Sequence, residues 1–143
     1  MAFESGARVM SGTHGSLWRN GSELAEVSAF QVKLTKSKTQ ILMCGRMAED
    51  SKVTGIKYTG SMTLHKVYTR GAADAEAIAQ GHDLRDSLVG KLADPDAFGA
   101  ERISCSGVSY DEQTLMDFAA GKNGETTIPF TCTAVQFLDK VEA

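Results

Sequence analysis

The stretch Thr54–Tyr68, TGIKYTGSMTLHKVY, decides the fold of this chain. Within it, most apolar side chains fall on even positions and most polar ones on odd positions, which is the two-residue period of a β-strand with one apolar and one polar face. Because ordinary strands run about five or six residues, an alternation this long predicts a large sheet. A chain of 143 residues does not easily close such a sheet alone, so we expect closure between subunits.

The composition indicates one globular domain with a real core. Hydrophobic residues make up 42% of the chain and charged residues 23%, which argues against disorder. The formal charge of −3 offers no basic footprint for nucleic acid, and no apolar run is long enough for a membrane anchor. The start, MAFESGARVMSG, lacks the apolar core of a signal peptide. We therefore expect a cytosolic chain with reduced thiols at Cys44, Cys105 and Cys132.

The first part of the chain predicts an arm and a hairpin. Residues 1–13 show no periodicity and are expected to form a flexible arm that orders on contact, which leaves 14–143 as a single domain. Asn20-Gly21 lies between Ser16–Arg19 and Ser22–Val27, and this dipeptide favours the type I′ turn of a β-hairpin.

The next segment predicts a second amphipathic strand and a loop. Alternation is sharp over Ala29–Lys36, and Thr39–Cys44 continues as extended chain after a break at Ser37-Lys38. Gly45–Thr54 then loses the pattern and gains charge. We interpret it as a surface loop that precedes the long strand.

After Tyr68 the sequence predicts one short helix followed by further strands. Alanine-rich sequence with early acidic residues and a stop at Gly81 predicts a helix over Ala72–Gln80. A longer helix through Leu92 is the alternative, because leucines recur every four residues, but Gly81 and Gly90 favour a strand. The remaining predicted elements are strands over Asp83–Ala93, Arg102–Tyr110, Gln113–Ala119 and Glu125–Leu138, a connector over Asp94–Gly99, a hairpin turn over Gly121–Gly124, and an edge or bulge at Pro129.

No catalytic or ligand-binding constellation is recognisable. The GxSxG, P-loop and GxGxxG motifs are missing, and the three histidines stand apart from one another at His14, His65 and His82. Carboxylates occur close together, but without the spacing of a calcium loop, at Glu49-Asp50 and at Asp94 and Asp96. We therefore expect no enzyme activity, no metal and no cofactor.

Several stretches, spread in order from about Met10 to Leu138, together resemble one protein family. They are MSGTHGSLWRNGSELAEVSAFQVKL from Met10, GRM at 45–47, TGIKYTGSMTLHKVYTR from Thr54, LADPDAFGAERIS from Leu92 and TTIPFTCTAVQFLD from Thr126. They resemble the tail tube proteins of contractile phage tails, above all those of PBSX-type defective prophages and of the diffocin-like, phage-tail-like bacteriocins of Gram-positive bacteria.

The resemblance implies a mainly β fold of two packed antiparallel sheets, a β-sandwich or barrel with one short helix, whose long strands join neighbours into an inter-subunit barrel. It implies a structural subunit without enzyme activity that forms stacked hexameric rings around a channel. The implied partners are further copies, a sheath protein, and baseplate and tail terminator proteins, with possible transient passage of phage DNA. The implied location is a virion tail or tail-like particle assembled in the bacterial host cytoplasm.

The resemblance also implies roles for particular segments. The inner strands would be Ala29–Lys36 and Ile56–Tyr68, with their apolar side chains against the subunit's own second sheet. The channel would be lined by the polar side chains Gln31, Lys33, Thr35, Lys57, Thr59, Ser61, Thr63 and His65. The loop Gly45–Thr54 would reach a neighbouring subunit or ring through Arg46, Met47, Ala48, Glu49, Asp50, Ser51 and Lys52. The arm and the segment near Phe137 would make further contacts.

One property of this assignment conflicts with DNA transit. Lys33, Lys57 and a protonated His65 would give the channel basic walls, which retain DNA through phosphate contacts. Three alternatives stay open: Glu49 and Asp50 offset the charge, the face assignment shifts along the strand, or no DNA passes.

Two other functions fit part of the sequence. The tube of a related injection machine, such as a type VI secretion system or a noncontractile tail, would look similar. A monomeric β-barrel for a small apolar ligand would need enough strands to close by itself.

Overall fold

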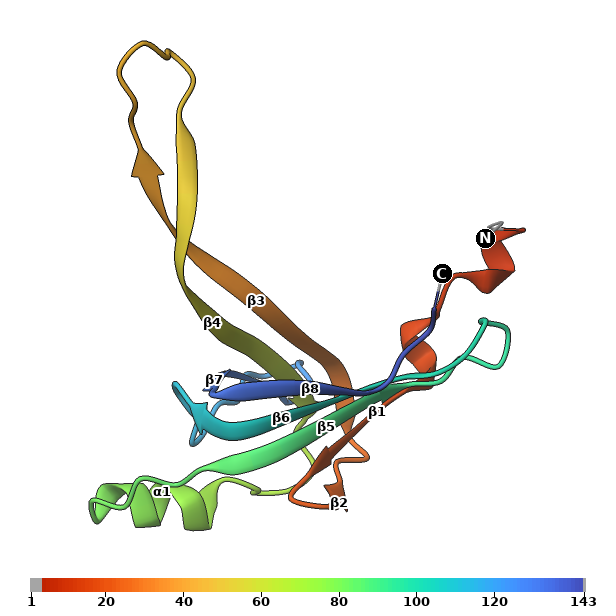
Figure 1. Ribbon diagram of the computed structural model, residues 1–143. Coiled ribbons are helices and arrows are strands. Elements are labelled where there is room, and N and C mark those ends of the chain that lie inside the picture. The colour runs from red at the N-terminus through yellow and green to blue at the C-terminus, as the bar shows by residue number, and fades with distance from the viewer. Residues whose placement is uncertain (1–3, 143) are drawn as a thin grey trace.

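A computed structural model describes residues 4–142 as a β-rich body from which one long hairpin projects (Figure 1). Two 3-10 turns, Gly6–Arg8 (η1) and Gly12–His14 (η2), precede the strands β1 (Gly15–Arg19), β2 (Ser22–Glu23), β3 (Val27–Ile41) and β4 (Asp50–His65). Helix α1 (Ala72–Ala79) is followed by the strands β5 (Asp86–Leu92), β6 (Glu101–Tyr110), β7 (Glu125–Cys132) and β8 (Ala134–Asp139). The mainly β fold with one short helix is confirmed. Residues 1–3 of the predicted arm lie outside the described residues.

The strands form one continuous antiparallel sheet rather than two separate sheets. Its hydrogen-bonded order is β2-β1-β5-β6-β7-β4-β3, with β8 paired to β6. β6 joins two halves of the sheet, one with β2, β1, β5 and β8 and the other with β7, β4 and β3. Its first part pairs with β5 and β8, while Ser109 and Tyr110 pair with β7. Since β2 and β3 stand at the two ends of this order, the sheet is open within one chain. The alternative of a barrel closed by a single copy is therefore wrong.

A corner at Gly107 explains why one strand serves both halves. Gly107 has a φ of 64°, and a Cβ added there would collide with the Thr133 side chain. Thr133 donates through its backbone N–H and its hydroxyl to the Ser106 carbonyl, at 3.0 and 3.1 Å. The predicted last strand is consequently broken at Thr133, so that β7 pairs with β4 while β8 pairs with β6.

Two phenylalanines pack the halves of the sheet together. Phe130 of β7 covers Gly60 of β4, and Phe30 of β3 contacts Gly90 of β5; a Cβ at either glycine would lie 2.7 Å from a ring atom. The two rings are stacked with their centroids 6.0 Å apart. Because the glycines let the rings approach the backbone, the two halves of the sheet pack closely at these positions. The other buried apolar residues are Leu17, Leu24, Met62, Leu64, Leu88, Cys105, Val108 and Cys132.

The hairpin predicted at Asn20-Gly21 is confirmed. Trp18 pairs with Glu23 and Arg19 with Ser22, and the turn residues have φ values of 49° and 85°, as a type I′ turn requires. β2 is shorter than expected because Leu24 turns into the core, where its N–H donates to the Leu17 carbonyl at 2.8 Å.

The short helix and the strands β5 and β6 agree with the prediction to within a few residues, and the longer helix through Leu92 is wrong. The segment Gln113–Ala119 is not a strand, so Gly121–Gly124 is not a hairpin turn. β6 and β7 overlap at only two residue pairs, so the 111–124 loop must run back beside β7 before entering it. Its first N–H, of Asp111, donates to Pro129 at 2.9 Å. Pro129 thus lies where pairing with β6 ends, as its missing N–H requires.

The two long strands form one hairpin that is longer than predicted. β3 continues through Ser37-Lys38 to Ile41, and β4 begins at Asp50, so the connecting loop is 42–49 rather than Gly45–Thr54. The pattern falters at the break because β4 has one extra residue, Thr54, which forms a bulge and donates its hydroxyl to the Ser37 carbonyl at 3.2 Å. β4 ends at His65 rather than Tyr68, since the next N–H, of Lys66, turns to the Gly124 carbonyl.

Replacing Met62 by Asp is expected to prevent folding, whereas Thr63→Asp is expected to be tolerated. Met62 is 3% exposed, so a carboxylate there would be buried without a partner at a cost above about 4 kcal/mol. Thr63 lies on the other face, where the change removes one hydroxyl contact with Thr127 and costs about 1 kcal/mol. Urea unfolding followed by circular dichroism measures both free energies, and equal losses would contradict the face assignment.

Candidate assembly surface

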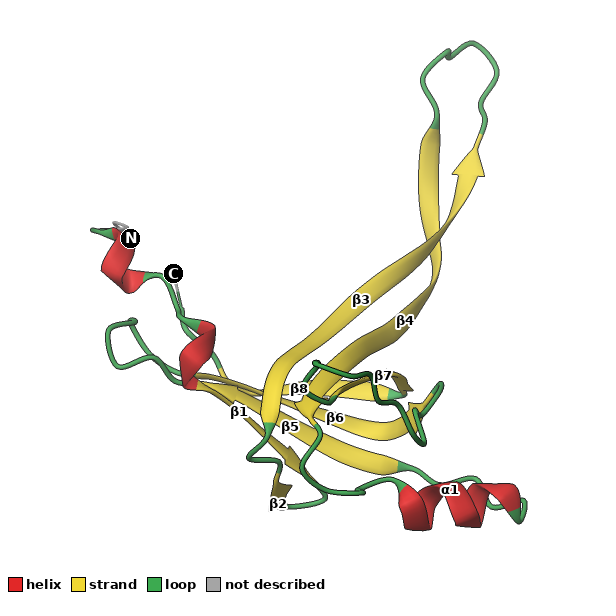
Figure 2. Ribbon diagram, turned by 180° about the vertical axis from the view of Figure 1, so that it is seen from behind, coloured by secondary structure: helices red, strands yellow, loops and turns green. Residues whose placement is uncertain are grey.

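The β3–β4 hairpin leaves the body where β7 ends. Cys132, the last residue of β7, pairs with Tyr58 of β4. Beyond that pair, the two strands run on as a ribbon that no third strand of the described chain flanks (Figures 1 and 2). We call Leu34–Ile41 and Asp50–Lys57 the stem. A two-stranded ribbon is marginally stable alone in water, so the stem requires cover from elsewhere.

One face of the stem is an uncovered continuation of the core. Opposite residues of paired strands share a face, so the pairs Phe30–Met62, Leu34–Tyr58, Lys36–Ile56 and Lys38–Val53 place their side chains together. Met62 is in the core, but Leu34, Ile56 and Val53 are 45% to 56% exposed. The apolar face of the body therefore extends into solvent, where Lys36 and Lys38 accompany the apolar side chains.

The other face brings all eight predicted channel residues together. The pairings on this face are Gln31 with Ser61, Lys33 with Thr59, Thr35 with Lys57, Thr63 with Thr127, and His65 with Glu125. The eight side chains are exposed or half-buried. Their common face agrees with the sequence analysis, and their position in a channel stays a prediction.

Sequence reasoning missed the third strand of this face. Glu125, Thr127 and Thr131 of β7 lie opposite His65, Thr63 and Thr59 of β4, and the two hydroxyls of Thr63 and Thr127 are 3.2 Å apart. The polar residues at odd positions of β7 could have been recognised from the sequence. The order of strands, which places β7 beside β4, could not.

Charges on the polar face are closer to balance than the sequence suggested. Lys52 lies opposite Thr39 and Asp50 opposite Ile41, so both belong to this face beyond the bulge. With Glu125 beside His65, two carboxylates accompany the three lysines, Lys33, Lys52 and Lys57. Asp50 and Glu125 are these carboxylates, and the choice among the three alternatives for the channel stays a prediction. Glu49 instead accepts a hydrogen bond from Gln40.

The hairpin tip separates the predicted loop residues into two groups. Arg46, Met47, Ala48 and Glu49 lie in the 42–49 loop, whereas Asp50, Ser51 and Lys52 are the first residues of β4. Met47 is fully exposed, and Leu42 is largely exposed. An apolar tip on a long projection is typical of a contact with another molecule.

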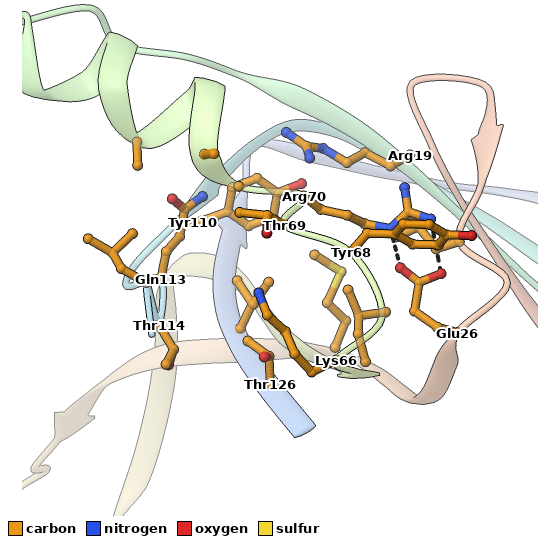
Figure 3. Close-up of a pocket in the computed structure, with 18 of the residues that line it drawn as sticks. Arg19, Glu26, Lys66, Tyr68, Thr69, Arg70, Tyr110, Gln113, Thr114 and Thr126 are labelled. Carbon is orange, nitrogen blue, oxygen red and sulfur yellow. Dashed lines mark hydrogen bonds and ion pairs between the residues drawn. The ribbon is translucent and has the colours of Figure 1, made fainter. Parts of the chain in front are cut away.

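A cavity of about 280 Å³ opens beside the C-terminal end of β4 (Figure 3). It lies between the chain after His65, the start of α1 and the 111–124 loop. Arg70 donates two hydrogen bonds to the Glu26 carboxylate, and its guanidinium lies 4.9 Å from the centre of the Tyr68 ring. Hydrogen bonding from Arg70 lowers the pKa of Glu26. Because Glu26 and Arg70 satisfy each other, the pair fixes the chain that leaves β4.

The N-terminal segment lies at the end of the body away from α1 (Figure 1), and Asp94 anchors it there. Its buried carboxylate accepts hydrogen bonds from the N–H groups of Asp96 at 2.9 Å and Ser11 at 2.8 Å. These bonds lower the pKa of Asp94. Arg8 adds a hydrogen bond to the Asp96 carbonyl and lies over Phe98. That the arm orders on contact with a neighbour stays a prediction.

The open sheet and its uncovered ribbon point to assembly. Within residues 4–142, no group of three or more His, Cys, Asp or Glu side chains is placed to hold a metal ion. In the same range, no helix has the length and apolar character to cross a membrane. An open sheet with an uncovered ribbon defines a structural β protein that is completed by association.

The chain belongs to the phage tail tube protein family, whose model matches residues 3–139. It is similar to the phage-like element PBSX protein XkdM of Bacillus subtilis (strain 168), with 27% identity over 126 residues and 86% of each chain covered.

Two solved structures from PVC, an extracellular contractile injection system, share the fold. A chain of the sheath/tube terminator matches with a TM-score of 0.75, 8% identity, and coverage of 96% of this chain and 100% of that one. A chain of the sheath–tube complex matches with a TM-score of 0.72, 7% identity, and 90% of each chain covered. The resemblance to tail tube proteins is confirmed.

Replacing Asp94 by Ala is expected to release residues 4–14 from the body. Both carboxylate hydrogen bonds are lost, so the Ser11 amide should exchange with deuterium roughly tenfold faster, as mass spectrometry of short peptides measures. Asp96→Ala is the matched control, because it keeps the backbone N–H that Asp94 binds.

The same release is expected at low pH. Since the folded-state pKa of Asp94 lies below its ordinary value, the stabilisation that Asp94 gives is present above the unfolded pKa and is lost as pH falls through the folded pKa.

Unchanged protection of the Ser11 amide in Asp94→Ala, after correction for intrinsic exchange rates, would show that the anchor is elsewhere.

Proposed function

We propose that this chain is the inner-tube subunit of a contractile phage tail or tail-like particle, assembling into hexameric rings that stack into a hollow tube. The observation that carries the proposal is the open sheet, whose end strands and stem are left incomplete by a single copy. Membership of the tail tube family and the fold shared with tube-bearing injection systems support it.

The strands β3, β4 and β7 form the channel wall in this proposal. Within residues 4–142, β3 pairs on one side only, so its free edge offers unpaired N–H and C=O groups along the strand. A neighbouring copy that pairs there continues the sheet into a barrel around the axis. The polar face of Gln31, Lys33 and their partners then faces the channel, because the opposite face packs on the body.

The tip and the two chain ends make the contacts between copies. Arg46, Met47, Ala48 and Glu49 reach a neighbouring subunit or ring, and Asp50, Ser51 and Lys52 flank that contact at the start of β4. Phe137 on β8, which is half exposed, and the N-terminal segment supply further contact area.

A tube of this kind implies particular protein partners. A sheath surrounds it, and baseplate and terminator proteins close its ends. The particle is a virion tail or a tail-like particle assembled in the host cytoplasm. Two carboxylates beside three lysines on the channel face support transit of phage DNA without firm retention, since bound phosphates scale with uncompensated positive charge.

The purified chain is expected to form rings or stacked tubes. Negative-stain electron microscopy would show annular end views, and analytical ultracentrifugation would measure the mass of the smallest closed species. A monodisperse monomer at high protein concentration would overturn the proposal.

Gold labelling tests which face lines the channel. In a Cys44→Ser background, which removes the exposed thiol while Cys105 and Cys132 stay buried, Thr35→Cys treated with a small gold maleimide is expected to place gold along the tube axis. Ala73→Cys on α1 is the control and should decorate the outer surface. Gold outside the tube in Thr35→Cys would refute the channel assignment.

A further inference from the structure

Charge is unevenly divided between the β3–β4 hairpin from Lys33 to Lys57, which includes the stem and the tip, and the rest of the chain. Residues 33–57 carry six basic and two acidic side chains, whereas the remaining residues carry nine basic and sixteen acidic ones. A basic projection on an acidic body is complementary to the body of another copy. The apolar face of the stem, with Lys36 and Lys38 among exposed apolar side chains, is therefore suited to an acidic, apolar surface.

The first part of the 111–124 loop has these two properties. Its sequence DEQTLMDF, residues 111–118, contains three acidic and no basic side chains. Leu115, Met116 and Phe118 are 68% to 86% exposed, the last two being the most exposed large apolar side chains of the described body apart from the hairpin tip. Exposed apolar groups rimmed by charge of one sign mark an interaction site.

The cavity beside β4 adds room at this surface. Gln113, Thr114 and Leu115 form one of its walls, and the cavity measures about 280 Å³ (Figure 3). An incoming aliphatic side chain, or Leu115 itself when pressed inward, can occupy that space.

Position in the fold shows which molecule the stem can reach. The loop ends at Gly124, whose carbonyl accepts from Lys66, directly after the C-terminal end of β4. The stem lies toward the other end of β4, and Ile56 is about 30 Å from His65 at the usual rise of a strand. A stem therefore cannot cover the loop of its own chain. A contact between opposite ends of two copies is heterologous and either closes into a ring or continues as a stack.

We propose that the stem of one copy docks on residues 111–118 of a second copy. The exposed side chains of Leu34, Val53 and Ile56 cover Leu115, Met116 and Phe118. Lys36 and Lys38 then face Glu112 and Asp117. The inference rests on the proposed tube function and specifies both surfaces of one subunit contact.

Charge exchange tests this contact. The donor variant Lys36→Glu with Lys38→Glu and the acceptor variant Glu112→Lys with Asp117→Lys are each expected to lower the assembled fraction at least tenfold in sedimentation velocity. Combining the four changes should restore assembly to within about twofold of the wild type. All positions are exposed, so thermal unfolding of the monomer should stay unchanged.

A matched control separates pairing from net charge. The donor variant combined with Glu23→Lys and Glu101→Lys, two exposed positions that do not line the cavity beside β4, has the same net charge as the rescued variant but should remain unassembled. Rescue by this control, or normal rings from the acceptor variant alone, would overturn the inference and leave the loop to a different partner. A wild-type protein that never assembles would instead contradict the proposed tube function itself and, with it, the docking contact.

Discussion

The pairing of β3 with β4 continues well beyond the part of the hairpin that the core covers. Up to Tyr58 the hairpin is held by β7 on its flank and by Phe30 and Phe130 on its apolar face. Beyond that point the same ladder continues, with the same alternation, over solvent. An amphipathic ribbon in this situation is stable only when another surface replaces the missing body. The incomplete sheet is therefore a property of one copy and not of the assembled protein.

Two bulges keep the faces of this ribbon distinct. Ser28 is the extra residue near the start of β3, so that Val27 joins Leu64 on the core face despite its odd number. Thr54 does the same for β4, which brings Val53 onto the face of Ile56. Bulges also increase local twist, which lets a straight pairing in the body become a projecting stem. Side chains thus keep to one of two faces from the core to the tip, although Lys36 and Lys38 lie among the apolar side chains of the core-side face.

Local sequence patterns predicted the elements better than their partners. The alternation of apolar and polar residues located β4 and its faces, Asn20-Gly21 located the first turn, and the alanine-rich stretch located α1. Each of these features depends on residues that are neighbours in sequence. The strand over Gln113–Ala119 was wrong: its apolar residues Leu115 and Met116 are adjacent rather than alternating, and the segment pairs with none of the described strands. The break at Thr133 and the addition of β7 to the polar face depend on strand order. That order is set by packing at Gly107 and Phe130, which no local pattern reveals.

Energetics favour a closed ring over a pair of subunits. Burying a large apolar side chain fully contributes roughly 1.5 to 3 kcal/mol, so the three half-covered stem residues contribute about 2 to 5 kcal/mol and the three more exposed loop residues about 3 to 7 kcal/mol. Exposed ion pairs add at most about 1 kcal/mol each. Association of two proteins costs an estimated 4 to 15 kcal/mol in lost translational and rotational freedom, which offsets most or all of the gain from a single contact. In a ring the last contact forms within an assembly already held together, without that loss. Every copy then both donates a stem and accepts one, and strand pairing along β3 adds to each contact. Closure is for this reason expected to be cooperative, with few species between the separate subunit and the complete ring.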